Sequence, residues 1–271
     1  RMLDFLIKRD PQIMGIVNVT PDSFSDGGRF DSHESAIAQG RRLAADGAHI
    51  IDVGGESTRP GAESISVRSE IERVVPVISA LSDGGITVSV DTSKPEVMKA
   101  AVAAGASMVN DIYALRQAGA LDMAARLGVP VCLMHMQGTP ATMQKAPYYD
   151  NIGKEIGEFL SSRIDTCLKA GIDRNRLLVD PGIGFGKTRA HNHTLMSQLP
   201  RFSALGVPLL IGVSRKAFVR ALVQIDSEEI LDEMSALLAL LAVEQGAKVV
   251  RVHNAGLTRG FFENRSGLEQ P

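Results

Sequence analysis

Short apolar runs rich in valine, isoleucine and leucine recur along the whole chain. Within each run the apolar residues are nearly continuous instead of alternating with polar ones. This is typical of strands that are covered on both faces in a parallel sheet. Eight such runs are predicted to be strands, at residues 13–17, 49–53, 86–90, 107–109, 130–134, 176–179, 208–213 and 248–252.

Longer amphipathic segments separate these runs and are predicted to be helices, at residues 35–46, 66–82, 95–104, 118–127, 151–170, 192–205 and 228–245. Ser66 and Pro95 favour helix starts. Glycines suited to a left-handed helix cap follow six of these helices, at Gly47, Gly105, Gly128, Gly171, Gly206 and Gly246. This order predicts a (β/α)8 barrel, an α/β fold formed by one domain over residues 1–271. A doubly wound open sheet has the same periodicity, so the pattern alone leaves it open.

The composition narrows the class of protein. Of 271 residues, 44% are hydrophobic and 22% are charged, which excludes disordered and fibrous proteins. The 29 basic and 31 acidic side chains nearly balance at a net charge of −2, so no nucleic-acid partner is expected. No apolar run approaches the roughly 20 residues of a membrane span, so no membrane partner is expected. Two cysteines are too few for a disulfide framework and favour a cytoplasmic location.

A polar segment follows each of the eight predicted strands. In a barrel all eight of these exits meet at one face, which is where catalytic residues lie. Capping of the next helix would explain some of the polar residues, such as Ser214. It does not explain why aspartate, asparagine, arginine, lysine and histidine recur from exit to exit. The pattern therefore favours one composite site at this face.

Asp91 and Asp180 follow the third and sixth strands and are the most informative pair. Each could simply form a salt bridge with a nearby Lys or Arg. Alternatively, a carboxylate can accept two hydrogen bonds from the N–H and NH2 groups of a 2-amino-4-oxo-pyrimidine edge. Asn110 and Lys216 could complete the contacts to such a ring, and Arg59, Arg251 and His253 could hold an anionic group.

A glycine-rich segment at residues 182–188 does not fit a nucleotide-binding loop. Pro181 stands where the phosphate loop of the Walker A type requires glycine. Bending of this loop over a ligand is the better explanation, with Phe185 as an aromatic wall. Met134, at another strand exit, could contact a flat ring. The histidines lack the spacing of a zinc site, so no transition metal is expected.

The strand exits resemble the dihydropteroate synthase family. The matching segments lie in the family's order at residues 15–28, 51–61, 90–95, 110–112, 134–138, 180–187, 214–216 and 251–253. The resemblance implies a (β/α)8 barrel that joins 6-hydroxymethyl-7,8-dihydropterin pyrophosphate to p-aminobenzoate. The products would be 7,8-dihydropteroate and pyrophosphate, in folate biosynthesis. It also implies a homodimer and a target of sulfonamides.

The resemblance carries over site residues position by position. For the pterin these are Asp91, Asn110, Asp180, Lys216, Arg251, Ile112, Met134, Gly212 and Phe185. For the diphosphate they are Asn18, Asp52, Thr58, Arg59, Arg251 and His253, and Asn18 would also bind Mg2+. For p-aminobenzoate they are Thr58, Arg59, Pro60, Phe185, Ser214 and Lys216. Catalysis would rest on Asp91, Lys216, Arg251 and His253.

Two departures from the family pattern lie near the end of the chain. Asn254 stands where the family commonly has Asp, and Gly256, Gly260 and Gly267 lower the helix propensity of the last segment. The eighth helix, at residues 257–271, is therefore expected to be short or disordered. The loops at residues 20–30 and 57–64 are expected to close over the site.

Two other functions remain open on the sequence alone. One is a pterin methyltransferase of the methyltetrahydrofolate type, which has no use for the segments at residues 57–60 and 214–216. The other is a pterin-binding protein without catalytic activity.

Overall fold

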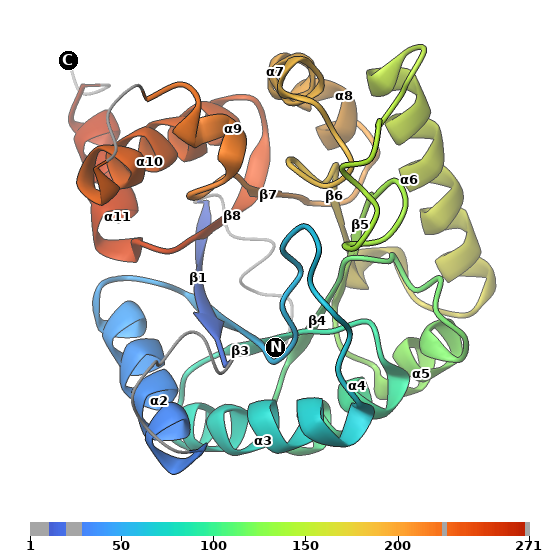
Figure 1. The fold of residues 1–271 in the computed structure, drawn as a ribbon, viewed down its shortest axis with the longest axis vertical. Coiled ribbons are helices and arrows are strands. Elements are labelled where there is room, and N and C mark those ends of the chain that lie inside the picture. Colours follow the sequence, from blue (N-terminus) through green and yellow to red (C-terminus); the bar gives the residue numbers. More distant parts are fainter. Residues whose placement is uncertain (1–10, 20–28, 224–226, 269–271) are drawn as a thin grey trace.

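Eight parallel strands close into a barrel in the computed structural model, which describes residues 11–19, 29–223 and 227–268 (Figure 1). The strands are β1 (Gln12–Asn18), β2 (Ile50–Gly54), β3 (Val88–Asp91), β4 (Met108–Asp111), β5 (Val131–Met134), β6 (Leu177–Asp180), β7 (Leu209–Gly212) and β8 (Ala247–Val252). All eight predicted strands are confirmed within a few residues of their expected bounds. Closure of the barrel excludes the open sheet that the periodicity had allowed.

Helices surround this barrel (Figure 1). They are α2 (Arg29–Ala45), α3 (Val67–Asp83), α4 (Pro95–Ala103), α5 (Ala120–Leu127), α6 (Ile152–Lys169), α7 (Arg189–Ser197), α8 (Leu199–Ser203), α9 (Ala217–Arg220), α10 (Glu228–Glu244) and α11 (Ala255–Leu268). The Ser66 side chain caps α3 by accepting from the Ser69 amide, and Pro95 begins α4. The six predicted capping glycines all have positive φ.

Two helix predictions need correction. The segment predicted as one helix at residues 192–205 is two helices, because the chain leaves helical geometry at Gln198 and a new helix begins at Leu199, with Pro200 in its first turn. The segment expected to be short or disordered after residue 257 forms α11. Its N-terminus is capped by Asn254, whose Oδ1 accepts from the Leu257 amide at 3.1 Å. Ala255 and Thr258 are buried, and packing of α11 against α10 and β1 outweighs the low helix propensity of the glycines.

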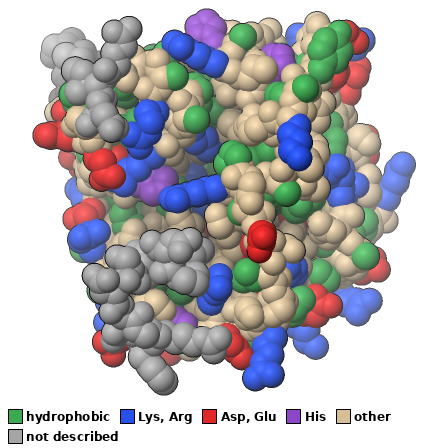
Figure 2. Space-filling model, viewed as in Figure 1, with side chains coloured by type: hydrophobic (Ala, Val, Ile, Leu, Met, Phe, Trp, Pro, Cys, Tyr) green, Lys and Arg blue, Asp and Glu red, His purple; other side chains and the backbone are tan. Residues whose placement is uncertain are grey.

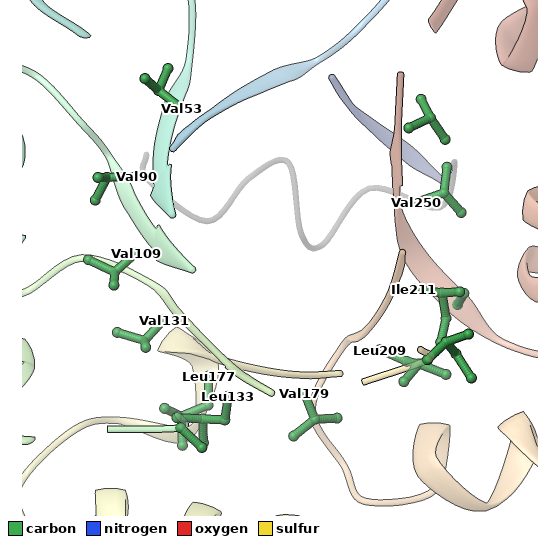
Figure 3. Close-up of a cluster of buried hydrophobic side chains, with 14 of the residues drawn as sticks. Val53, Val90, Val109, Val131, Leu133, Leu177, Val179, Leu209, Ile211 and Val250 are labelled. Atoms are coloured by element: carbon green, nitrogen blue, oxygen red, sulfur yellow. The ribbon is translucent and has the colours of Figure 1, made fainter. Parts of the chain in front are cut away.

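Side chains alternate between the two sides of each barrel strand. One set points outward and packs under the helices, and Figure 3 shows part of it directed away from the barrel axis. The other set points into the barrel. Its lower layer is a separate apolar cluster made of Met14, Ile50, Met108, Cys132, Leu178, Leu210 and Val249.

The next inward position, two residues further along each strand, lies at the carboxyl end of the barrel. There the apolar layer gives way to a mixed and largely polar one. Its members are Ile16, Asp52, Asp91, Asn110, Met134, Asp180, Gly212 and Arg251, and Asn18 lies one step further along β1. The strand register sets Gly54 beside Asn18 on one side and beside Asp91 on the other. Barrel closure thus places residues far apart in sequence around one mouth.

Candidate active site

Arg251 of β8 joins two carboxylates at the barrel mouth. Its Nε donates to Asp52 Oδ2 at 2.6 Å, and its Nη2 donates to Asp91 Oδ2 at 2.9 Å. The same Asp52 oxygen accepts from Asn110 Nδ2 at 3.0 Å. Asp52 is fully buried, with a relative exposure of 0%. One carboxylate from β2 therefore fixes an arginine from β8 and an asparagine from β4.

Asp91 lies at the end of β3, and its side chain is 12% exposed. Burial raises the pKa of Asp91 above its usual range, the Arg251 guanidinium opposes this, and the nearby Asp52 carboxylate adds to it. A carboxylate held between an arginine and a second carboxylate responds strongly to any positive charge placed above it. This position is therefore suited to stabilise a cation.

Asp180 and Lys216 form a second charged pair at the mouth. Asp180 Oδ1 accepts from the Gly182 amide at 2.7 Å. Lys216 donates to the Ile183 carbonyl and lies 4.7 Å from the centre of the Phe185 ring. Burial raises the pKa of Asp180, although the Lys216 charge opposes the shift. Burial also lowers the pKa of Lys216 to about 8, against the opposing charge of Asp180.

Gly182 is required where the loop after β6 turns. Its φ is +70°, and a Cβ there would lie 1.9 Å from the His135 carbonyl oxygen. The glycine therefore lets the loop pass against β5. In this way the carboxylate of Asp180 and the Phe185 ring face the same mouth.

An apolar wall flanks these charges. Ile112, Met134, Met136 and Met143 form a small buried cluster, and Phe185 and Tyr113 pack against it. The cluster is separate from the main core and combines residues from the exits of β4, β5 and β6. Gly212, at the end of β7, leaves open the space beside Lys216 and Arg251. A flat ring could lie between this wall and the charged groups.

His253 and Ser214 meet at the exits of β8 and β7. The His253 backbone N–H donates to Ser214 Oγ at 3.1 Å, and the hydroxyl lies 2.9 Å from His253 Nδ1. Burial lowers the pKa of His253 to about 3, and the positive charge of Arg251 adds to this effect. The low pKa keeps the ring neutral near pH 7, and its Nδ1 faces the serine hydroxyl.

Thr58, Arg59 and Pro60 lie on the loop between β2 and α3, which Figure 1 draws across the barrel mouth. Thr58 is half-buried, whereas Arg59 and Pro60 are exposed. The Gly61 amide donates to the Pro140 carbonyl at 3.2 Å, so this loop reaches the one that follows β5. Most of the other loop expected to close, at residues 20–30, lies outside the described residues. On the face shown in Figure 2, basic and histidine side chains gather around the mouth.

The residues present fit a magnesium ion that takes most of its ligands from phosphate and water. Asn18 ends β1 half-buried, and its Oδ1 lies 3.8 Å from the position that a Cβ on Gly54 would take. An amide oxygen is a ligand that Mg2+ accepts, and this ion commonly takes one or two protein ligands with the remainder from phosphate and water. Within the described residues, no group of three or more His, Cys, Asp or Glu side chains could hold a metal ion.

The sequence did not reveal one buried carboxylate that shapes the mouth. Asp111 accepts from the amides of Tyr113 and Leu115 at 2.8 and 2.7 Å. It holds a turn in which Ala114 and Leu115 have φ of 53° and 57°, a conformation that non-glycine residues rarely adopt. Ile112 lies in this turn. The adjacent Asn110-Asp111 pair was a usable signal, because two polar residues in succession at a strand end cannot both face the barrel interior.

Comparison with known proteins decides the family. The model of the pterin binding enzymes matches residues 14–253. Dihydropteroate synthase of Escherichia coli strain K12 is 48% identical over 245 residues, which cover 90% of this chain and 86% of that protein. The chain belongs to the dihydropteroate synthase family.

Solved structures of this family agree with the fold. Xanthomonas albilineans dihydropteroate synthase with 4-aminobenzoic acid superimposes with a TM-score of 0.90 at 49% identity, over 97% of this chain and 95% of that chain. A Yersinia pestis dihydropteroate synthase with a sulfonamide drug superimposes with a TM-score of 0.90 at 45% identity, over 96% and 94% of the two chains. The resemblance inferred from the strand exits is confirmed. Membership in this family of enzymes does not support the methyltransferase and non-catalytic alternatives.

Proposed function

We propose that this chain joins 6-hydroxymethyl-7,8-dihydropterin pyrophosphate to p-aminobenzoate at the barrel mouth. The observation that carries the proposal is the Arg251 guanidinium, which bridges Asp52 and Asp91 beside Asn110. It supplies an anion-binding group directly beside a carboxylate. A reaction in which the leaving group departs as an anion and a carbocation remains needs a positive group to stabilise the anion and a negative group to stabilise the cation.

The pterin would lie edge-on against Asp180, with Asn110 and Lys216 completing its polar contacts. The Asp180 carboxylate can accept both the ring N–H and the 2-amino group. The faces of the ring would contact Arg251 on one side and the apolar wall of Ile112, Met134 and Phe185 on the other, where Gly212 leaves room. This arrangement uses the inward groups Asn110, Asp180 and Arg251, with Asp91 beside Arg251, and Asp52 supports it through Arg251 and Asn110.

The diphosphate would be held by the basic rim of the mouth. Arg251, His253 and Arg59 supply hydrogen-bond donors, with Thr58 and Asn18 beside them. Because the His253 ring is neutral near pH 7, it would bind the diphosphate through a hydrogen bond without adding charge. Mg2+, bound through Asn18 and the phosphate oxygens, would supply further neutralisation of the leaving group. Since Asp52 is fully buried, any part it takes in diphosphate binding passes through Arg251.

Bond breaking would precede bond making. The C–O bond to the diphosphate breaks with its electron pair on the leaving oxygen, and the pterin methylene becomes a cation conjugated with the ring. The Asp91 carboxylate stabilises that cation, while Arg251 and His253 stabilise the released diphosphate. The neutral amine of p-aminobenzoate then forms the C–N bond with its lone pair, and the resulting ammonium gives its proton to the released diphosphate or to solvent.

The amine substrate would bind against Thr58, Arg59, Pro60, Phe185, Ser214 and Lys216. Two of its walls belong to loops, so we expect weak binding until the diphosphate is present to order them. Sulfonamides carry the same aniline and a carboxylate-like sulfonyl group, and the Yersinia pestis relative was solved with such a drug. We therefore expect sulfonamides to compete with p-aminobenzoate here.

A coupled assay for pyrophosphate release tests the proposal. Release should require the pterin pyrophosphate and p-aminobenzoate together with Mg2+, and a sulfonamide should inhibit it competitively against p-aminobenzoate. Calorimetry with each substrate alone tests the binding order. Tight p-aminobenzoate binding to the free protein would contradict ordered binding, and absence of pyrophosphate release would contradict the function.

The protein is further proposed to be a cytoplasmic homodimer. Both cysteines are buried and unpaired, as in proteins of a reducing compartment.

Leu237 and Leu241 lie one turn apart on α10 with exposures of 39% and 40%, and such an apolar pair favours burial against a second copy. Sedimentation of the wild type and Leu241→Glu should give a dimer and a monomer, respectively. No helix among the described residues is long and apolar enough to span a membrane.

A further inference from the structure

A partly buried lysine outside the proposed substrate contacts holds the base of the loop that carries Thr58, Arg59 and Pro60. Lys94 Nζ donates three hydrogen bonds, to Glu56 Oε1 at 3.0 Å, to Glu70 Oε2 at 2.6 Å and to the Ile65 carbonyl at 2.9 Å. These partners lie at the start of the loop, on α3 and at the end of the loop. One ammonium group therefore joins both ends of the loop to the helix that follows it.

Two further contacts close the same point. The Ile65 amide donates to Glu56 Oε1 at 2.7 Å, and Arg73 Nη1 of α3 donates to the Gly55 carbonyl at 2.8 Å. Residues 55–56 and residue 65 are thus fixed together, and only residues 57–64 project. This projecting part contains the residues proposed to bind p-aminobenzoate.

The charges make Lys94 indispensable to this arrangement. Glu70 is fully buried, and its second oxygen has no hydrogen-bond partner among the described residues. Burial by itself would lower the pKa of Lys94, but the hydrogen bonds to Glu70 and Glu56 outweigh it and raise this pKa. The lysine is therefore charged at neutral pH. Its removal would leave a buried carboxylate without a counter-ion, which is strongly unfavourable.

Lys94 also connects the loop to the strand ends that carry Asp91 and Asn110 of the proposed pterin site. It follows Asp91 by three residues, and its backbone N–H donates to Thr92 Oγ1 at 3.3 Å. The Thr92 N–H in turn donates to the Asn110 carbonyl at 3.0 Å. The connection after β3 therefore has two branches: Asp91 faces the proposed pterin site, and Lys94 faces away from it towards the loop.

We propose that Lys94, Glu56 and Glu70 are positioning residues that set the p-aminobenzoate subsite without contacting either substrate. The inference rests on the proposed function, since it assigns the loop tip to the amine substrate. Loss of the cluster should release the tip while leaving Asp91, Asn110 and Asp180 in place. Because Thr58 and Arg59 are also proposed to hold the diphosphate, the comparison is between p-aminobenzoate and a pterin that lacks the diphosphate. These two ligands should respond differently to the same substitution.

Lys94→Met tests this, because methionine keeps most of the side-chain length and removes the ammonium. We expect the KM for p-aminobenzoate to rise about tenfold, as for the loss of one charge-assisted hydrogen bond, and pterin affinity by calorimetry to stay within about twofold. Lys94→Arg should recover part of the KM. Lys154→Met, at an exposed lysine paired with Glu158 on α6, is the matched control and should behave as wild type. An unchanged KM, or pterin affinity that falls as much as the KM rises, would overturn the inference.

A second variant and a second readout keep the test decisive. Should Lys94→Met fail to fold, Glu56→Gln removes one charge that is 21% exposed from the cluster and should raise the same KM by a smaller factor. Hydrogen exchange should quicken at residues 57–65 in either variant and not at residues 182–187. Unaltered exchange at residues 57–65 contradicts the positioning role. A wild-type enzyme that releases no pyrophosphate contradicts the proposed function instead, and the exchange result still stands.

Discussion

The two inward layers of the barrel are built on the same strands and differ in almost every physical property. On β6, Leu178 belongs to the apolar layer and Asp180 to the mouth, and on β8 Val249 is followed in the same way by Arg251. The lower residues are fully buried among carbon and sulfur atoms. The upper ones are charged, and burial shifts the pKa of Asp180 upward. A step of two residues thus separates packing from chemistry.

This contrast indicates that the lower layer contributes to the folding stability of the barrel, whereas the buried charges of the mouth reduce that stability. Burying a charge is unfavourable unless partners compensate for it. Arg251 compensates Asp52 and Asp91, yet burial still holds the pKa of Asp91 above its usual range. Groups kept in such a state are typical of sites that bind and transform a ligand. Substitutions in the two layers should therefore have opposite consequences.

The largest effect is expected at Asp180. Asp180→Asn replaces an acceptor for two donors by a group that presents a donor of its own, so pterin affinity should fall roughly 100-fold or more. The Gly182 amide keeps a carbonyl acceptor, and a buried charge is removed, so stability should be equal or higher. Calorimetry with a pterin and equilibrium denaturation measure the two quantities. Wild-type pterin affinity in this variant would refute the assignment of the mouth.

Two residues away, Leu178 should give the reverse. Leu178→Ala leaves a cavity in the apolar layer and should lower the free energy of unfolding by about 2–5 kcal/mol. Pterin affinity per folded molecule should change by less than about threefold, because no ligand contact is removed. Leu178→Met is the matched control, since it conserves volume. A large loss of affinity with little loss of stability would break the division between the layers.

Much of this division could be predicted from the sequence. Continuous apolar runs indicated the eight strands, because parallel strands covered on both faces need little else. The polar exits indicated a common face, since barrel closure brings every strand end together. Asp91, Asn110 and Asp180 could therefore be assigned to one mouth from their positions along the chain, whereas Asp52 was indicated only by the resemblance to the family.

The contacts between residues on opposite sides of the mouth could not be predicted from the sequence. The Arg251 contact with Asp52 spans 199 positions, and neither residue alone indicates which partner it takes. Lys94 was equally uninformative, because its partners lie on another loop and on α3. The last helix was mispredicted because local propensity counts glycines and takes no account of the packing of α11 against α10 and β1. Long-range packing decided all three.

A smaller effect, dependent on pH, is expected at Lys216. Burial lowers its pKa in the folded protein to about 8, from the ordinary value of 10.5. Between these pH values the unfolded chain binds more protons, so this lysine makes the protein more stable as pH rises. Lys216→Met should therefore be more stable than wild type at pH 7, and this advantage should shrink between pH 8 and pH 10.5. Equilibrium denaturation of both proteins at several pH values measures the difference.

A constant difference between the two proteins across that range would contradict the burial of a charged Lys216. Lys154→Met is a suitable control, because Lys154 is largely exposed. Its stability relative to wild type should not depend on pH in this interval. The comparison separates the buried mouth from the solvent-exposed surface.

The smallest effect is expected at Asn254, a polar residue at the carboxyl end of the barrel with a structural role. Its Oδ1 caps α11, and its Nδ2 donates to Asp232 Oδ2 at 3.1 Å. Asp232 keeps two hydrogen bonds from Arg215 without it. Asn254→Ala should therefore lower the free energy of unfolding by about 1 kcal/mol, the usual value of a lost helix cap, and leave pyrophosphate release within about twofold of wild type. Asn254→Ser keeps a capping oxygen and should recover most of the stability. A loss of activity at unchanged stability would instead place Asn254 in the active site. The functional residues of the mouth would then extend beyond the strand ends.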